Sequence, residues 1–170
     1  MPGSGRVPAP LVSNEGGPMP KPYTKRQERI GTVVIKYMTK MNVWVQRKSK
    51  GKLLAKFPGG APIGILTTIG RKSGQPRECA LLYLADGKNV VVVASKGGMP
   101  KDPDWYLNVV DNPNVSFEIG GHSHKYIAHT ADAVEKARLW PELVRMYKQY
   151  EDYQARTSRS IPVVICSPVS

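Results

Sequence analysis

The chain has 170 residues, the length of one domain, and its 25 Lys and Arg residues against 13 Asp and Glu residues give a net charge of +12. This charge predicts an anionic partner, and nucleic acid, a membrane surface and a small polyanionic ligand are all candidates. No apolar stretch is long enough for a transmembrane helix and no secretory signal is recognisable, so we expect a cytoplasmic protein. Cys79 and Cys166 lie inside apolar runs, which favours buried thiols over a disulfide framework.

The N-terminal segment differs in composition from the rest of the chain. Residues 1–23 are rich in Pro and Gly and contain hardly any large apolar side chains, so we expect them to be disordered. Residues 24–170 are expected to form a single domain. From Thr24 to about Lys50, apolar residues recur at helical spacing beside a basic border, which predicts an amphipathic helix. Such a helix either covers the core or lies at an anionic membrane interface.

A hairpin with a basic tip follows. The apolar, β-branched run Ile63–Ile69 predicts a buried strand, and a second apolar run returns at Cys79–Leu84. Between them lies a Gly-Arg-Lys-Ser-Gly turn at residues 70–74. Its glycines let main-chain N–H groups point at an anion while Arg71, Lys72 and Arg77 supply charge, which indicates a phosphate or carboxylate clamp. Basic residues at a hairpin tip can also be merely solubilising, and the composition leaves both interpretations open.

Further strands are predicted along the rest of the chain. They cover residues 89–94, 115–119, 122–129 and 161–166. A second glycine turn with a cation, residues 95–98, follows the first of these strands and is expected to lie near the hairpin tip. His122 and His124 share one strand face at a metal-ligand spacing, but no Cys or carboxylate cluster accompanies them, so we predict no metal site.

Two helical regions are predicted in the second half of the chain. Asp102 before Pro103 is a good N-cap for a short helix over residues 104–110. Asp132 and Glu135 form a capping-box pattern at the head of the last helical region, which Pro141 is expected to break or kink.

Three tyrosines share one face of this last helical region. They are Tyr147, Tyr150 and Tyr153. Core packing is the usual reason for an aromatic stripe, but three buried phenols each need a hydrogen-bond partner, which favours the wall of a binding pocket.

With these motifs in hand, the chain resembles the deazaflavin-dependent nitroreductase family, and within it the F420H2-dependent quinone reductases. The resemblance rests on a series of motifs in a fixed order: Asn42-Val-Trp44, Leu66-Thr-Thr-Ile-Gly-Arg-Lys-Ser-Gly-Gln-Pro-Arg77, Ala94-Ser-Lys-Gly-Gly98, Trp105-Tyr-Leu-Asn108, Asn112-Pro113, Trp140-Pro-Glu-Leu-Val144, Tyr147-x-x-Tyr-x-x-Tyr153 and Ile161-Pro162. It implies an α+β fold, a split β-barrel of the flavin-reductase or FMN-binding kind, made of antiparallel strands with an N-terminal amphipathic helix and a C-terminal helical region.

The resemblance also implies a cofactor, coenzyme F420 in its reduced form, F420H2, and a set of residues that bind it. Four of them would hold its phosphate and oligoglutamate tail: Arg71, Lys72, Ser73 and Arg77. The others would line the deazaflavin: Glu78, Cys79, Ala80, Leu81, Leu82, Tyr83, Val93, Ala94, Ser95, Lys96, Asp104, Trp105, Tyr106, Leu107, Asn108 and Tyr150. Because Glu78 and Asp104 would place carboxylates beside an anion, we expect each to turn away or to pair with a nearby Arg or Lys.

The implied reaction is hydride transfer from F420H2 to a lipophilic acceptor, such as a menaquinone-like quinone or a nitro-aromatic compound. Tyr150 and Ser95 are the expected catalytic hydroxyls, because a hydroxyl can stabilise negative charge on the acceptor oxygen or supply a proton. The expected substrate-binding residues are Tyr147, Tyr153, Tyr37 and Trp44, with the N-terminal helix as a lid that can also touch the inner face of the cell membrane.

Two other functions compete with this reading. An FMN- or haem-binding split-barrel protein without F420 activity is the first, because one fold carries several functions. A nucleic-acid binder is suggested by the charge, but the cations gather at glycine turns and no recognised binding module is present, so we expect no nucleic-acid partner.

Overall fold

The structure is a computed structural model, and it describes residues 23–27, 29–31, 41, 43–45, 48 and 60–169. Its elements are β1 (Ile63–Ile69), β2 (Pro76–Asp86), β3 (Asn89–Val93), the one-turn 3₁₀ helix η1 (Lys96–Gly98), α2 (Asp104–Asp111), β4 (Asn114–Ile119), β5 (His122–Thr130), α3 (Ala133–Met146), α4 (Gln149–Ala155) and β6 (Val163–Pro168). The expected disordered segment lies outside the described residues except for Tyr23. Of the expected N-terminal helix, the described residues after Thr24 are helical, and the others, including Tyr37, lie outside the described residues.

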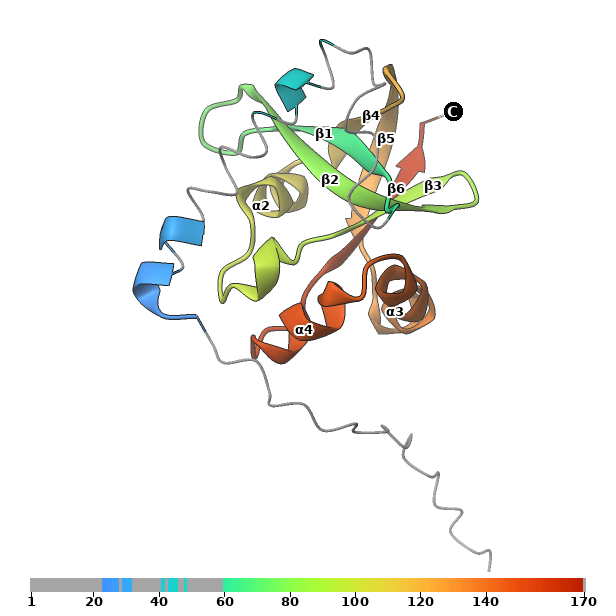
Figure 1. Cartoon of the computed structure of the whole chain (residues 1–170). Helices are drawn as coiled ribbons and strands as arrows, with labels where there is room; N and C mark the ends of the chain where they lie inside the picture. Colours follow the sequence, from blue (N-terminus) through green and yellow to red (C-terminus); the bar gives the residue numbers. More distant parts are fainter. Residues whose placement is uncertain are drawn as a thin grey trace, which may run out of the picture.

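The six strands of the described chain form a closed antiparallel barrel in the order β1-β2-β3-β6-β5-β4 (Figure 1). Runs of β-branched residues make the buried strands, as expected for side chains that pack well on a pleated surface. The closing pair, β1 with β4, places Leu66 beside Phe117. Both side chains are fully buried in the barrel, where a Cβ at Gly64 would overlap the Phe117 ring. A glycine is therefore required at this point of β1.

The described residues form two hydrophobic cores, one on each side of the barrel wall. The inner core fills the barrel and includes Val92 and Val164 from the wall and Trp105 and Val109 from α2, which closes one end. The outer core lies between the wall and the two C-terminal helices, and Figure 1 shows α3 and α4 beside the barrel. It includes the wall residues Val91, Val93, Val163 and Ile165 and the helix residues Leu139, Leu143 and Tyr150.

Two details of the helix boundaries differ from the sequence-based prediction. Asp102 does not cap α2, whose N-cap is Pro103, because the Asp102 carboxylate is drawn to Arg159 instead. Pro141 does not break α3, which runs continuously to Met146. The break falls between α3 and α4 instead. The capping box of Asp132 and Glu135 is present as predicted. None of the helices in the described part of the chain is long and apolar enough to cross a membrane.

Candidate active site

The tip of the β1–β2 hairpin is a compact turn held by its own backbone. The Gly70 N–H donates to Gln75 O at 2.9 Å, while Gly70 O accepts from the N–H groups of Ser73 at 3.0 Å and Gly74 at 2.7 Å. Gly74 has a φ of +64°, a conformation that glycine adopts without a side-chain penalty. The residues between the two glycines are exposed. The turn is therefore a fixed platform for its polar side chains.

Arg71 joins this tip to α2. Its N–H and its Nη1 both donate to Asn108 Oδ1 at 3.2 Å, and its Nη2 lies 3.3 Å from Asp104 Oδ1. The buried Asn108 amide also donates to Thr68 Oγ1 at 3.1 Å. Asp104 thus pairs with an arginine as predicted, and both Arg71 and Asn108 are engaged in holding α2 to the hairpin.

Lys72, Ser73 and Arg77 remain available on the same tip. All three are exposed, and the ion pairs of the described chain include neither Lys72 nor Arg77. Arg77 Nη2 donates to Ser73 Oγ at 3.2 Å, which holds the guanidinium beside the turn. Two cations and a hydroxyl on a rigid turn form a donor set suited to phosphate or carboxylate oxygens.

The loop after β3 has an unusual backbone. Lys96, Gly97 and Gly98 are left-handed in succession, with φ values of 45°, 66° and 77°. Lys96 is the one residue other than glycine with a positive φ in the part of the chain that the structure describes. Because such a conformation is costly for a residue with a Cβ, surrounding contacts must hold it in place.

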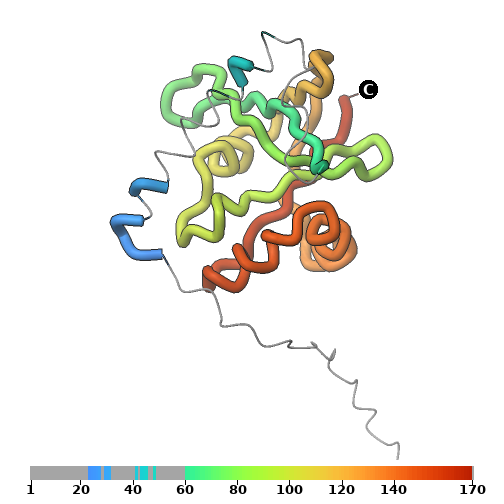
Figure 2. Tube along the Cα trace, viewed as in Figure 1, coloured from blue at the N-terminus to red at the C-terminus, as the bar shows by residue number. Residues whose placement is uncertain are grey.

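This loop presses against α4. A Cβ on Gly98 would lie 2.6 Å from the backbone oxygen of Tyr153, so the two segments are in direct backbone contact. The half-buried Ser95 begins the loop, and its hydroxyl makes no capping bond to η1. Figure 2 shows the hairpin tip, α2, this loop and α4 along one side of the molecule, with the β2–β3 turn on the opposite side. The two glycine turns predicted to lie near each other are thus on the same side, with α2 between them.

The tyrosines of the last helical region form a cluster on the outer core. Ring centroids of Tyr147 and Tyr150 are 5.0 Å apart, and those of Tyr150 and Tyr153 are 6.4 Å apart. The hydroxyls of Tyr147 and Tyr153 both donate to Gln149 Oε1, the latter at 3.0 Å, and lie 3.2 Å from each other. Two of the three phenols therefore have partners within the helix itself.

Tyr150 is the buried member, with 4% of its surface exposed. Burial raises the pKa of its phenol, and the neighbouring Tyr147 and Tyr153 raise it further. Its hydroxyl takes no part in the hydrogen bonds to Gln149. The Tyr150 phenol therefore stays protonated, and its hydroxyl does not donate to Gln149.

The remaining predicted residues occupy several environments. On β2, Cys79, Leu81 and Tyr83 line the inner core, whereas Glu78 is exposed. Ala80 and Leu82 alternate with the inner-core residues and so face the other side of that strand. Val93 packs in the outer core, Ala94 and Trp105 pack in the inner core, Leu107 is half-buried, and Tyr106 shares a hydrogen bond with Thr130. Trp44 is 58% exposed, with Lys48 Nζ 4.9 Å from its ring centroid.

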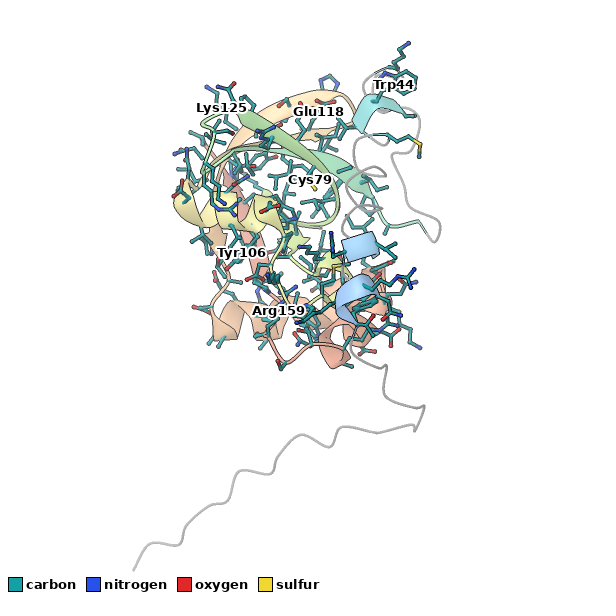
Figure 3. The ribbon with its side chains drawn as sticks, turned by 90° about the vertical axis from the view of Figure 1, so that its left-hand side faces the viewer. Trp44, Cys79, Tyr106, Glu118, Lys125 and Arg159 are labelled. Carbon is teal, nitrogen blue, oxygen red and sulfur yellow. The ribbon has the colours of Figure 1, made fainter. Side chains whose placement is uncertain are left out.

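Several residues of this side of the molecule were not found from the sequence. Gln149 orients two phenols, and Arg156 donates to Tyr23 at 2.7 Å and lies over its ring. Arg159 bonds to the loop after β3 from a turn more than fifty residues away in the chain. In Figure 3, which faces this side, Cys79, Tyr106 and Arg159 follow one another from the upper to the lower part of the molecule. No motif surrounds Arg159 that would have indicated its partners.

Comparisons with known proteins match most of the chain. A family model described as F420H(2)-dependent quinone reductase matches residues 38–168. The F420H(2)-dependent quinone reductase of Mycobacterium tuberculosis (strain ATCC 25618 / H37Rv) is 40% identical over 128 residues, which are 71% of this chain and 83% of that protein. A solved structure of an F420-H2 dependent reductase is 39% identical with a TM-score of 0.59, and the match covers 62% of this chain and 94% of that one.

Another solved chain, described as a domain-swapped dimer, is 33% identical with a TM-score of 0.61 over 80% of this chain and 98% of its own length. These matches confirm the split β-barrel that the family resemblance implied. The region matched by the family model contains the hairpin tip, the loop after β3 and the tyrosine cluster. The chain therefore belongs to the F420H2-dependent quinone reductase family, a family of oxidoreductases whose cofactor is reduced coenzyme F420.

Proposed function

We propose that this protein transfers a hydride from reduced coenzyme F420 to a lipophilic acceptor, and that the side of the barrel bearing the hairpin tip and α4 holds both molecules. Membership of the family carries the proposal, because the match spans all three parts of the candidate site. It also disfavours the alternative of an FMN- or haem-binding split-barrel protein without F420 activity.

The donor set at the hairpin tip suits the anionic end of this cofactor. Lys72, Ser73 and Arg77 would hold its phosphate and oligoglutamate groups, since they are exposed and no carboxylate among the described residues forms an ion pair with Lys72 or Arg77. Arg71 would act mainly through the fold, because Asp104 and Asn108 already engage its guanidinium. The other predicted cofactor-lining residues, on β2, on the loop after β3 and on α2, would surround the ring.

Bound F420H2 supplies the hydride, so the task of this chain is to orient donor and acceptor and to manage charge on the acceptor. The Tyr150 hydroxyl would hold a proton for the acceptor oxygen, because its raised pKa keeps the phenol neutral. The Ser95 hydroxyl would donate a second hydrogen bond to the same oxygen from the loop that presses on α4. The outer core beneath Tyr150 keeps water from its inner side.

The acceptor would be a menaquinone-like quinone or a nitro-aromatic compound. Tyr147 and Tyr153, with Tyr37 and Trp44 from the N-terminal region, would form its apolar surroundings. Ile30, Met41 and Trp44 are more than half exposed, and the cation of Lys48 lies beside the Trp44 ring. Exposed apolar groups beside a cation suit peripheral contact with an anionic membrane that holds a quinone, at the inner face of the cell membrane.

Cofactor binding tests the hairpin tip. Lys72→Ala and Arg77→Ala are each expected to weaken F420 binding by about 1–3 kcal/mol, the loss of charge-assisted hydrogen bonds. Titration of the oxidised cofactor, followed by fluorescence, measures this. Lys88→Ala is the matched control, because Lys88 is an exposed lysine in the turn between β2 and β3, on the opposite side of the molecule. Equal affinity in all three variants and the wild type would place the anion site elsewhere.

Turnover tests the tyrosine. Tyr150→Phe keeps the ring and removes the hydroxyl, so we expect kcat for F420H2 and menadione, a quinone, to fall about tenfold to a hundredfold with little change in cofactor affinity. Tyr126→Phe is the control, because Tyr126 is a buried tyrosine of the inner core. If Tyr150→Phe retains wild-type kcat and loses only stability, the tyrosine cluster is ordinary core.

A further inference from the structure

The Arg159 side chain forms several hydrogen bonds to the loop after β3, which is distant from it in the sequence. It lies in the connection between α4 and β6 (Figure 3). Only 15% of its side chain is exposed. Its Nη2 donates to Ala94 O at 3.1 Å and to Ser95 O at 2.9 Å. Its Nε donates to Met99 O at 2.9 Å. One guanidinium thus binds the carbonyls that precede and follow η1.

An ion pair fixes the guanidinium in this position. Arg159 Nη1 lies 2.7 Å from Asp102 Oδ1, and Asp102 belongs to the same loop, just before α2. The planar fork of arginine suits several acceptors at fixed angles, which the single ammonium group of lysine cannot reproduce. Within the loop, Lys96 has the left-handed φ of 45° that needs support from its surroundings. The bonds of Arg159 on both sides of Lys96 provide that support.

We propose that Arg159 is a positioning residue for hydride transfer. By fixing the carbonyls of Ala94, Ser95 and Met99, it sets where the Ser95 hydroxyl and the Lys96 ammonium group stand relative to α4. It touches neither cofactor nor acceptor and acts through the loop. The inference rests on the proposed function, in which Ser95 bonds to the acceptor oxygen.

The test is a double-mutant cycle on kcat with F420H2 and menadione. Arg159→Lys keeps the charge and loses the fork, and Ser95→Ala removes the hydroxyl that the fork is proposed to position. We expect each single variant to lose about tenfold in kcat, since small misplacements of a reacting group have large kinetic effects. The double variant should lie within about threefold of either single variant, because both changes remove the same interaction.

Arg138→Lys is the matched control. Arg138 makes a bidentate pair with Asp86, with Nη1–Oδ1 at 3.1 Å and Nη2–Oδ2 at 2.7 Å, at the end of β2. The same substitution there removes an arginine fork outside the loop, and we expect kcat to remain at the wild-type value. A loss that multiplies in the double variant, or an equal loss in Arg138→Lys, would show that Arg159 contributes only to stability and would overturn the proposal.

The outcomes distinguish a failure of the proposed function from a failure of the proposed role of Arg159. If the wild type fails to reduce menadione with F420H2, or if Ser95→Ala is fully active, the proposed function or its serine is wrong. If the wild type and Ser95→Ala behave as expected but Arg159→Lys has wild-type kcat, only the role of Arg159 is wrong. Should Arg159→Lys fail to fold, Asp102→Asn decides, because it removes the negative charge of the ion pair and leaves the carbonyl bonds. We expect a loss of about threefold that disappears in the Ser95→Ala background, and an unchanged kcat would refute the proposal.

Discussion

Replacing Gly98 with alanine tests the contact between the loop after β3 and α4. The added Cβ would lie 2.6 Å from Tyr153 O and 2.9 Å from Tyr153 Cα, and backbone atoms of a helix cannot move aside as a flexible side chain can. Overpacking of this kind costs about 1–3 kcal/mol. The φ of +77° adds about 1–2 kcal/mol for any residue with a Cβ. We therefore expect a loss of about 2–5 kcal/mol, a large fraction of the stability of an ordinary domain.

Gly97→Ala separates the two contributions. Gly97 has a similar φ of +66°, but a Cβ there would meet nothing within 4 Å. Only the backbone term of about 1–2 kcal/mol is expected in this variant. The difference between the two variants, about 1–3 kcal/mol, corresponds to roughly 2–12 °C in Tm for a chain of this length. Urea unfolding at 25 °C and a thermal melt measure it. Equal destabilisation by both substitutions would show that η1 and α4 are not in backbone contact.

Two further predictions concern contacts that hold α2 and α3 to the strands of the barrel. Asn108→Ala removes the buried amide that ties α2 to the hairpin tip and leaves its partners unsatisfied, so we expect a loss of about 1–3 kcal/mol in urea unfolding. An unchanged midpoint would mean that the tip is held elsewhere. The hydrogen bond from Arg138 lowers the pKa of Asp86, so this carboxylate contributes stability at neutral pH that is lost as the pH falls through its folded-state pKa. Asp86→Asn should therefore be less stable than the wild type at pH 7 and equal to it in strong acid, and a constant difference would contradict the pairing.

The strands were predictable because their signals are local. Four consecutive valines indicated a strand buried on both faces, and β3 is one. Glycine turns marked the ends of the hairpins. The sequence could not show that alternate valines of β3 face two different cores, since this depends on α3 and α4 packing outside a barrel wall.

The geometry of the candidate site was predictable where a continuous motif carries it, as in the glycine turn at the hairpin tip. It was not predictable where the partners are distant in the chain. Arg71 donates to Asn108, 37 residues away in the chain, and no local pattern indicates that contact. Arg159 lies 57 residues from Asp102, and no local pattern indicates that pair. The predicted helix break at Pro141 was wrong for a related reason. Tertiary packing keeps α3 continuous where local preference alone favours a break.

The two cores on either side of one barrel wall have a consequence for divergence within such a fold. Helix α2, to which Asn108 ties the hairpin tip, is anchored to the inner core, whereas the tyrosine helix α4 rests on the outer one. Substitutions that reshape the helix layer leave the packing inside the barrel intact, because β3 and β6 stand between them. Under the proposed function, acceptor preference can drift while the cofactor end is conserved in shape. An oxidoreductase of this fold can thus come to use new oxidants while its binding of the reductant stays the same.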